Sequence, residues 1–249
     1  MKAPNPIAFT IFGIDVMWYG ILIALGFILA IYISYRRASK FDIKPDNILD
    51  FAIVLLPVSV IGARLYYVAF RWEYYQGDLQ SIINIRNGGL AIHGGILFGL
   101  IAGLLVCKFR KINVLNLADL VFPSVALAQS IGRWGNFFNS EAHGGPTDLP
   151  IAVIIEGQRY HPTFLYESVF CFFLFWILLW LSGRRKFKGQ IALLYGMLYS
   201  LERYFVEGLR TDSLMLGDIR IAQLVSILSI FGCAIAYFIL NRNSKEINK

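Results

Sequence analysis

Residues 16–35 read VMWYGILIALGFILAIYISY and contain no charged side chain. As a helix, this stretch is long enough to cross the roughly 30 Å hydrocarbon core of a bilayer. Residues 221–241 form a second uncharged stretch of similar length. The chain of 249 residues is 57% hydrophobic and 16% charged, whereas a soluble domain carries about 25% charged residues. The sequence therefore predicts an integral membrane protein.

Seven apolar segments are expected to cross the membrane, so the predicted fold is an all-α helical bundle. The expected spans lie near 16–35, 48–70, 89–107, 116–137, 162–182, 190–207 and 220–240. Pro45-Asp46-Asn47 is a suitable start for the second span. We expect one integral membrane domain over residues 1–249. Its exposed parts would be an N-terminal arm at 1–15, an outer segment at about 138–161 and a cytoplasmic tail at about 241–249.

The loops that join these spans differ in charge. One set is strongly basic and contains only a few acids; its cations are Arg36, Arg37, Lys40, Lys44, Lys108, Arg110, Lys111, Arg184, Arg185, Lys186, Lys188, Arg242, Lys245 and Lys249. The opposite loops mix Arg71, Arg86, Arg159, Arg210 and Arg220 with several acids. By the positive-inside rule the basic loops are cytoplasmic, which places the N-terminus outside and the C-terminus inside. This topology accounts for the net charge of +7, so the charge does not indicate nucleic-acid binding.

Residues 132–141, GRWGNFFNSE, combine Arg133, Asn136, Asn139 and Glu141 with glycines and aromatics where a span should end. Ionisable groups at membrane depth are costly and usually functional. The planar guanidinium of Arg133 suits a lipid phosphate. The alternative is an arginine that merely reaches the headgroups from a helix end.

Polar residues of other spans are expected at the same outer level. They are Tyr19, Arg64, His93, Arg203 and Glu207. This convergence from five spans predicts one site near the outer leaflet, in which Arg64 is structural. Two interpretations of His93 stay open: a structural histidine whose hydrogen bonds are made within the protein, or a functional residue.

Tyr195, Tyr199, Arg203 and Glu207 recur every four residues and should form one helix stripe. The alternative is an Arg203–Glu207 pair that only neutralises itself. The sequence leaves open whether Glu202 faces solvent or the site. Gly95, Gly99 and Gly103 form a ladder that should let a neighbouring helix approach closely.

The three cysteines and three histidines show no metal or nucleotide motif. Cys107, Cys171 and Cys233 lie in or at the edge of apolar spans and are expected to be small buried hydrophobes. We expect no metal and no cofactor.

Several motifs together resemble the prolipoprotein diacylglyceryl transferase family, in the same order and over nearly the whole chain. They are Trp18-Tyr19-Gly20; His93-Gly94-Gly95; Gly132-Arg133-x-Gly135-Asn136-x-x-Asn139-x-Glu141-x-x-Gly144; His161-Pro162-Thr163-x-x-Tyr166-Glu167; and Tyr199 with Arg203-x-x-x-Glu207. The resemblance implies a multi-pass enzyme of the bacterial plasma membrane. It would transfer the diacylglyceryl group of phosphatidylglycerol to the lipobox cysteine of a prolipoprotein and release glycerol phosphate, the first step of lipoprotein maturation.

The resemblance also implies the site residues. The expected catalytic set is His93, Arg203, Tyr19, Tyr199 and Glu207, and the expected substrate-binding set is Arg133, Asn136, Glu141 and Asn139. Thioether formation needs a deprotonated thiol, for which His93 is the candidate base. Arg133 and Arg203 would stabilise the phosphate that leaves, and Glu141 and Glu207 would orient the arginines.

Two other classes of protein also place charges within a membrane. A transporter or channel is one, but its site usually lies at the midplane between inverted repeats, and no repeat is visible here. Another lipid-headgroup enzyme, such as a phosphatase, is the second, and its product would be free phosphate.

Overall fold

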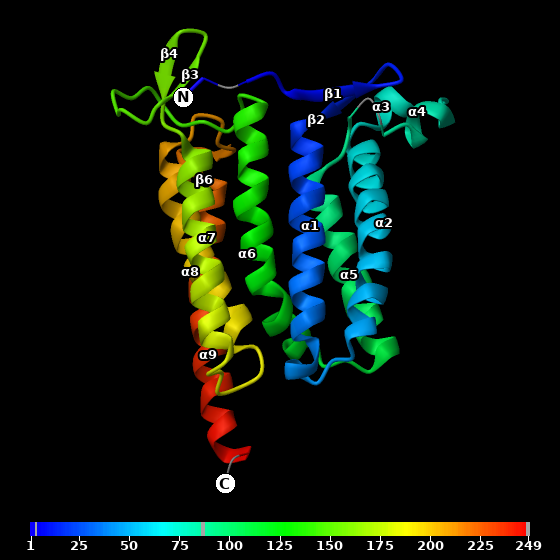
Figure 1. Ribbon diagram of the computed structural model, residues 1–249, viewed down its shortest axis with the longest axis vertical. Coiled ribbons are helices and arrows are strands. Elements are labelled where there is room, and N and C mark those ends of the chain that lie inside the picture. Colours follow the sequence, from blue (N-terminus) through cyan, green and yellow to red (C-terminus); the bar gives the residue numbers. More distant parts are fainter. Residues whose placement is uncertain (3, 86–87, 248–249) are drawn as a thin grey trace. The chain divides into compact units, whose positions relative to one another are not determined.

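A computed structural model describes residues 1–2, 4–85 and 88–247, and the side chains up to residue 244. Arg86 and Lys249, two of the charged loop residues, lie outside the described residues, and so does the side chain of Lys245. The chain is an all-α polytopic membrane protein, as its composition predicts (Figure 1). Its long helices are α1 (Trp18–Arg37), α2 (Pro45–Phe70), α5 (Ile92–Arg110), α6 (Val114–Phe138), α7 (Thr163–Ser182), α8 (Gln190–Leu209) and α9 (Ile221–Ile247).

Each predicted span corresponds to one of these long helices. Among the described residues, six helices are long and apolar enough to cross a membrane, and α8 is not one of them. Helix α8 carries three charged side chains, Glu202, Arg203 and Glu207. The number of crossings therefore stays a prediction. Helix α2 begins at Pro45, at the expected start signal, and α9 continues past the expected end of its span at residue 240.

Short elements connect the long helices. They are the 3-10 helix η1 (Ala38–Phe41), the helical turns α3 (Trp72–Tyr75) and α4 (Leu79–Ile83), and the strands β1 (Ile7–Ile11), β2 (Ile14–Met17), β3 (Val153–Ile155), β4 (Gln158–Tyr160), β5 (Met215–Leu216) and β6 (Ile219–Arg220). The strands form three antiparallel hairpins, β1–β2, β3–β4 and β5–β6. The expected N-terminal arm thus contains most of a hairpin, and the expected outer segment contains another.

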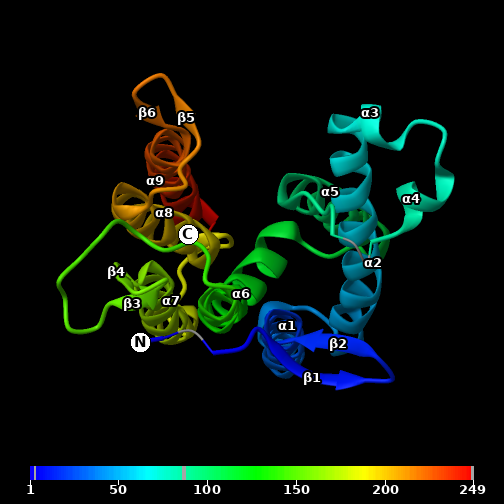
Figure 2. The ribbon, with the colours of Figure 1, turned by 90° about the horizontal axis from the view of Figure 1, so that it is seen from above.

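The chain divides into two compact units, residues 1–34 with 118–249 and residues 35–117. In the first unit α8 packs between α7 and α9 (Figure 2). Its buried core includes Ala126, Leu174, Phe175, Leu178 and Ile191. Helix α6 joins α7 where the Ser130 hydroxyl donates to the Ser168 carbonyl over 2.8 Å. Gly26 of α1 lies directly against Ala128 of α6, where a Cβ would come within 3.1 Å of a backbone oxygen.

Asp119 is a buried acid of the first unit, and its role is structural. Its carboxylate accepts backbone N–H groups from Gly189, Ile191 and Ala192, and it pairs with Arg185. The first N–H groups of a helix have no partner within the helix. Asp119 therefore caps the start of α8 and fixes it against α6.

The second unit is built on the contact between α2 and α5. A Cβ on Gly94 would lie 2.4 Å from the Gly62 carbonyl oxygen, and one on Gly99 would lie 2.5 Å from the Ser59 hydroxyl. Gly95 and Gly103 also face α2, at Ser59 and Phe51. The prediction that the glycine ladder allows a close helix approach is confirmed.

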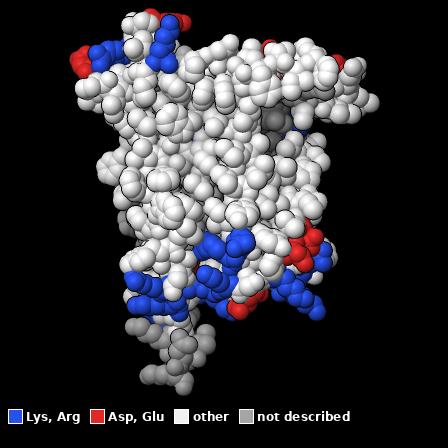
Figure 3. All heavy atoms as spheres, in the orientation of Figure 1, with Lys and Arg blue, Asp and Glu red and all other residues white. Residues whose placement is uncertain are grey.

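Charged side chains are rare along the sides of the long helices, on the face drawn in Figure 3. Lys and Arg gather beyond the helix ends, as in the loop 183–189 of the first unit. Cys107 and Cys171 are buried and Cys233 is half-buried, and all three are free thiols.

Candidate active site

The centre of the candidate site is Glu167, in the second turn of α7. Its side chain is 1% exposed, and its two oxygens hold two different arginines. Arg133 of α6 places Nε 2.8 Å from Oε2, and Arg203 of α8 places Nη1 2.7 Å from Oε1. One buried carboxylate therefore bridges two guanidinium groups from two helices.

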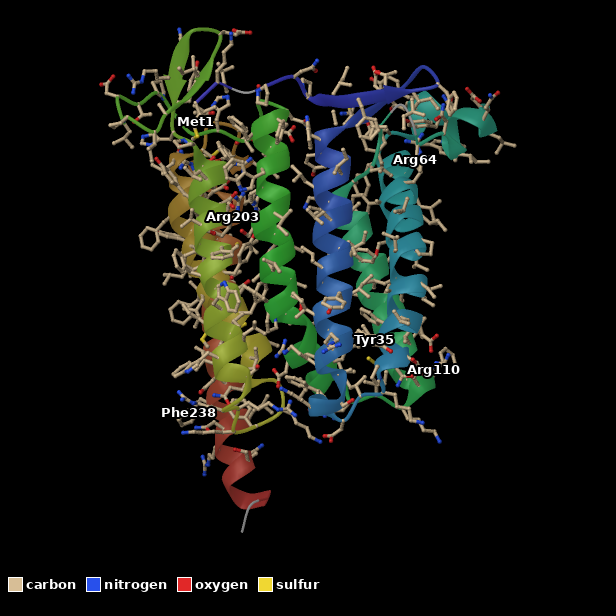
Figure 4. The ribbon with its side chains drawn as sticks, in the orientation of Figure 1. Met1, Tyr35, Arg64, Arg110, Arg203 and Phe238 are labelled. Carbon is tan, nitrogen blue, oxygen red and sulfur yellow. The ribbon has the colours of Figure 1, made fainter. Side chains whose placement is uncertain are left out.

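Arg203 has a second acidic partner. Its Nη2 lies 2.6 Å from Oε2 of Glu207, one turn further along α8. In Figure 4 the labelled Arg203 lies on the side of α8 that faces α6 and α7. The predicted Arg203–Glu207 pair is present, but it is not a closed pair, because Glu167 shares the same guanidinium.

The two guanidinium groups are buried only in part. The Arg133 and Arg203 side chains are 21% and 22% exposed, whereas Glu167 and Glu207 are almost fully buried. The acids are thus fixed behind the arginines, and part of each arginine stays accessible. This arrangement suits the binding of an external anion, which guanidinium groups recognise through paired N–H donors.

The predicted stripe on α8 is confirmed. The rings of Tyr195 and Tyr199 stack with 5.5 Å between their centroids. The Tyr195 hydroxyl donates to Gln129 over 2.7 Å, and the Tyr199 hydroxyl accepts from Nη2 of Arg133 over 3.3 Å. Arg133 and Arg203, together with Glu167 and Glu207, are called the arginine cluster below. Tyr199 contacts this cluster directly, whereas Tyr195 packs behind Tyr199 in the core.

Glu141 occupies a different place from the one expected. It was expected to orient an arginine, but its Oε1 accepts from the side-chain amides of Asn136 and Asn139, at 3.0 and 3.3 Å. The backbone N–H of Glu141 also donates to the Asn136 carbonyl. Three predicted binding residues thus form one polar group at the exposed end of α6.

The glycines of the same motif have a packing reason. A Cβ on Gly135 would come within 2.5 Å of the Tyr19 ring, so Tyr19 packs directly against α6. A Cβ on Gly144 would lie 2.7 Å from His161 and 2.9 Å from the Leu209 carbonyl oxygen. Thr163 also donates its hydroxyl to the Ala142 carbonyl. These contacts hold the segment after α6 against the ends of α7 and α8.

His93 and Arg64 belong to the other unit. His93 is exposed in the first turn of α5, with its ring centroid 6.2 Å from that of Tyr66 on α2. Arg64 is 7% exposed and donates to four backbone carbonyls, those of Ser81, Ile82, Gly88 and Gly89, over 2.6–2.9 Å. These partners support the expectation that Arg64 is structural. The catalytic role expected of His93 stays a prediction.

Glu167 belongs to one of the motifs found in the sequence, but no role was predicted for it. The signal was available, because Glu167 is the only charged residue between Thr163 and Ser182. A lone carboxylate in an apolar span needs a cationic partner. Which cation it meets depends on how α6, α7 and α8 are rotated against one another. Among the described residues, no three His, Cys, Asp or Glu side chains are grouped to hold a metal ion.

Long apolar helices define a polytopic membrane protein, and its buried carboxylates hold two partly exposed arginines. A model of the family described as prolipoprotein diacylglyceryl transferase matches residues 6–239. The chain belongs to this family of transferases.

Individual relatives agree with the family model. The chain is 50% identical over 240 residues to a phosphatidylglycerol–prolipoprotein diacylglyceryl transferase of Clostridioides difficile, covering 96% of this chain and 97% of the relative. A protein of the same name from Finegoldia magna is 51% identical and covers 90% of this chain and 91% of its own length. One from Clostridium novyi is 50% identical, over 91% and 92% of the two chains.

Proposed function

We propose that this protein transfers the diacylglyceryl group of phosphatidylglycerol to the lipobox cysteine of prolipoproteins, the first step of lipoprotein maturation. The observation that carries the proposal is the Arg133–Glu167–Arg203 bridge in a member of this transferase family. Phosphatidylglycerol carries one negative charge on its phosphodiester. Two accessible guanidinium groups are a suitable receptor for that charge.

The reaction is a displacement at carbon. The cysteine sulfur attacks the glycerol carbon that bears the phosphate, the carbon–sulfur bond forms, and the carbon–oxygen bond to phosphate breaks. Glycerol phosphate leaves with the bonding electron pair, and the thiol proton passes to a base. Negative charge on the phosphate grows in the transition state, so fixed cationic donors at that position lower the barrier.

The residues of the site take distinct roles in this proposal. Arg133 and Arg203 bind the phosphodiester and stabilise the leaving phosphate, and Glu207 orients Arg203. Tyr199, whose oxygen accepts from Arg133, donates its own hydroxyl proton in a hydrogen bond to the substrate, and Tyr19, which packs against α6 at Gly135, donates a further one. His93 accepts the thiol proton. The group of Asn136, Asn139 and Glu141 offers further polar contacts for the substrates.

The proposed setting is the bacterial plasma membrane, with seven crossings, the N-terminus outside and the site near the outer leaflet. The charge asymmetry of the loops supports this topology. In a variant without native cysteines, a cysteine introduced at Asp78 or Asp148 should react in intact cells with an impermeant thiol reagent. A cysteine at Lys186 should react only after the cells are opened. Labelling of position 186 in intact cells would reverse the assigned orientation.

Product analysis tests the function itself. Purified protein is incubated with phosphatidylglycerol and a lipobox peptide, and the mass of the peptide is measured by mass spectrometry. We expect the peptide to gain one diacylglyceryl group through its cysteine, with an equal amount of glycerol phosphate released. Free phosphate in place of the lipidated peptide would indicate a phosphatase. No product from folded protein would remove the enzyme assignment and favour a transporter.

A further inference from the structure

Glu202 of α8 is a buried acid without a partner. The residue is 7% exposed. Neither carboxylate oxygen has a hydrogen-bond partner among the described residues, and both are shielded from solvent. A buried ionised carboxylate without hydrogen bonds or a counter-ion is very unfavourable, and such a group usually becomes neutral instead. Glu202 therefore differs from Glu167 and Glu207, which are as deeply buried but are paired with arginine.

The charges around Glu202 do not balance. The groups that act on it are Glu167 of α7, Arg133 of α6 and its neighbour Arg203. Cys171 of α7 is also within electrostatic reach. Helix α9, which packs on the opposite side of α8, offers Cys233 against Gly196 and Arg220 just before its start, bonded to the Glu207 carbonyl. The other titratable groups on the same helix are Tyr195, Tyr199, Tyr204 and Glu207.

The two guanidinium groups are already engaged. Glu167 takes one donor of each arginine, and Glu207 takes a second donor of Arg203. With Glu202 ionised, three carboxylates would face the two guanidinium groups of Arg133 and Arg203. Arg210 also acts on Glu167 and Glu207 but is paired with Asp212, and Arg220 binds a backbone carbonyl. The excess negative charge would lie in a region of low dielectric constant, where repulsion between carboxylates is strong. Removing that charge requires one proton, and Glu202 is the one of these three acids to which neither arginine is bonded.

We propose that Glu202 carries this proton and keeps the arginine cluster electrically neutral, so that the cluster can accept an anionic phosphodiester. Glu202 is a positioning residue, since it acts through the charges of Arg133 and Arg203 and touches no substrate atom. The protonation state stands on burial and charge balance alone. The effect on lipid binding rests on the proposed function.

The proposal has a direct consequence for lipid binding. In alkaline solution the O–H bond of Glu202 breaks and the proton passes to solvent hydroxide. The cluster then gains one negative charge beside the arginines that bind phosphate. The KM for phosphatidylglycerol should rise by at least about tenfold, since an added charge at such distances costs more than the thermal energy. The rate at saturating lipid should change much less.

Infrared spectroscopy tests the proton without any reference to activity. The protein, in a detergent without ester groups, should show the C=O stretch of a protonated carboxylic acid at neutral pH, and deuterium oxide should shift it. Glu202→Gln should lose this band, and Glu202→Leu gives the same comparison if the Gln variant does not accumulate. The matched control is Glu156→Gln, at the exposed turn between β3 and β4, which should keep the band. An unchanged spectrum in the Glu202 variant means that Glu202 is ionised, and the proposal is overturned.

The pH dependence of KM tests the proposed effect of Glu202 on lipid binding. Wild-type KM for phosphatidylglycerol should rise with pH in alkaline solution, whereas Glu202→Gln, which is neutral at every pH, should give a flat profile. The same alkaline rise in both proteins would overturn the role of Glu202 in lipid binding. A wild-type protein that shows the infrared band but transfers no lipid would instead remove the proposed function and leave the protonation of Glu202 established.

Discussion

The two units hold their buried arginines in different ways. In one unit Arg64 has all three of its nitrogens bonded to backbone carbonyls, and its guanidinium lies 5.0 Å from the centre of the Tyr75 ring (Figure 4). In the other unit Arg133 and Arg203 are held by carboxylates and keep about a fifth of their surface exposed. The neutral carbonyls around Arg64 accept hydrogen bonds from all three of its nitrogens, so this arginine fixes a loop. Acids that hold an arginine from behind leave part of it free to bind an anion.

Changing the two arginines that are held by carboxylates should give the largest effect. Arg133→Lys and Arg203→Lys keep the charge but lose the planar fork, and an ammonium cannot bond a carboxylate and a phosphate in the same geometry. Each variant should fold and insert, yet lose at least ~100-fold in transfer rate at saturating phosphatidylglycerol, the scale of losing one preorganised donor. The measurement is the initial rate of peptide lipidation.

Arg159→Lys, on the exposed strand β4, is the matched control and should stay within about twofold of wild type, as expected for a surface change. Near-normal rates for both Arg133→Lys and Arg203→Lys would mean that these arginines only reach the interface. The phosphate-binding model would then be abandoned.

The bridge itself should give the next largest effect. Glu167→Gln removes the shared counter-ion of Arg133 and Arg203 but keeps the size of the side chain. We expect a loss of about tenfold or more in transfer, together with lower thermal stability, because removing one partner of a buried ion pair leaves the other uncompensated.

A double-mutant cycle of Glu167→Gln with Arg133→Lys identifies the cause. If Glu167 acts by holding Arg133, the double variant should lose much less than the product of the two single losses. Fully multiplicative losses would show that Glu167 and Arg133 act independently.

Arg64→Lys should show the opposite pattern. A lysine can reach only part of the four carbonyls, so at least one partly buried carbonyl loses its donor, at a cost of about 1 kcal/mol in the free energy of unfolding. Transfer per folded molecule should change far less than in the Arg133 and Arg203 variants. Thermal unfolding and transfer rate are measured on the same preparation. If the variant has wild-type stability but a hundredfold lower transfer rate, Arg64 takes part in the reaction and is not a structural residue.

The pair of Arg210 and the half-exposed Asp212 should give the smallest effect. Two hydrogen bonds from Arg210, at 2.9 and 2.7 Å, lower the pKa of Asp212 below its usual value. The pair therefore stabilises the protein above the unfolded pKa of about 3.9, and this contribution is lost as pH falls through the lower folded pKa. Asp212 is half-exposed, so solvent screening limits the contribution to less than about 1 kcal/mol.

Thermal unfolding across pH measures this contribution. Asp212→Asn should unfold slightly more easily than wild type at pH 7, and the difference should vanish in strong acid. A difference that grows in acid would contradict the assigned direction.

The long helices, the close approach of a neighbouring helix to the glycines of α5, and the stripe of Tyr195, Tyr199, Arg203 and Glu207 could all be predicted from the sequence. This is possible because bilayer thickness fixes the length of a span, and helical periodicity fixes which residues share a face. The motifs also predicted the family. Each of these features depends on residues that are close in sequence or on one pattern along a single helix.

The partners of the charged residues follow from the packing of the helices and could not be predicted from the sequence. The Glu167 bridge, the contact of Glu141 with two asparagines and the isolation of Glu202 all depend on how helices from distant parts of the chain are rotated and aligned. A shift of one residue along α8 would turn its side chains by 100°, because a helix has 3.6 residues per turn. Such a shift leaves the hydropathy of the helix almost unchanged, whereas an ion pair is lost when its charged groups move apart by a few ångströms. The sequence pattern therefore defines the helices, and the packing of the helices defines the site.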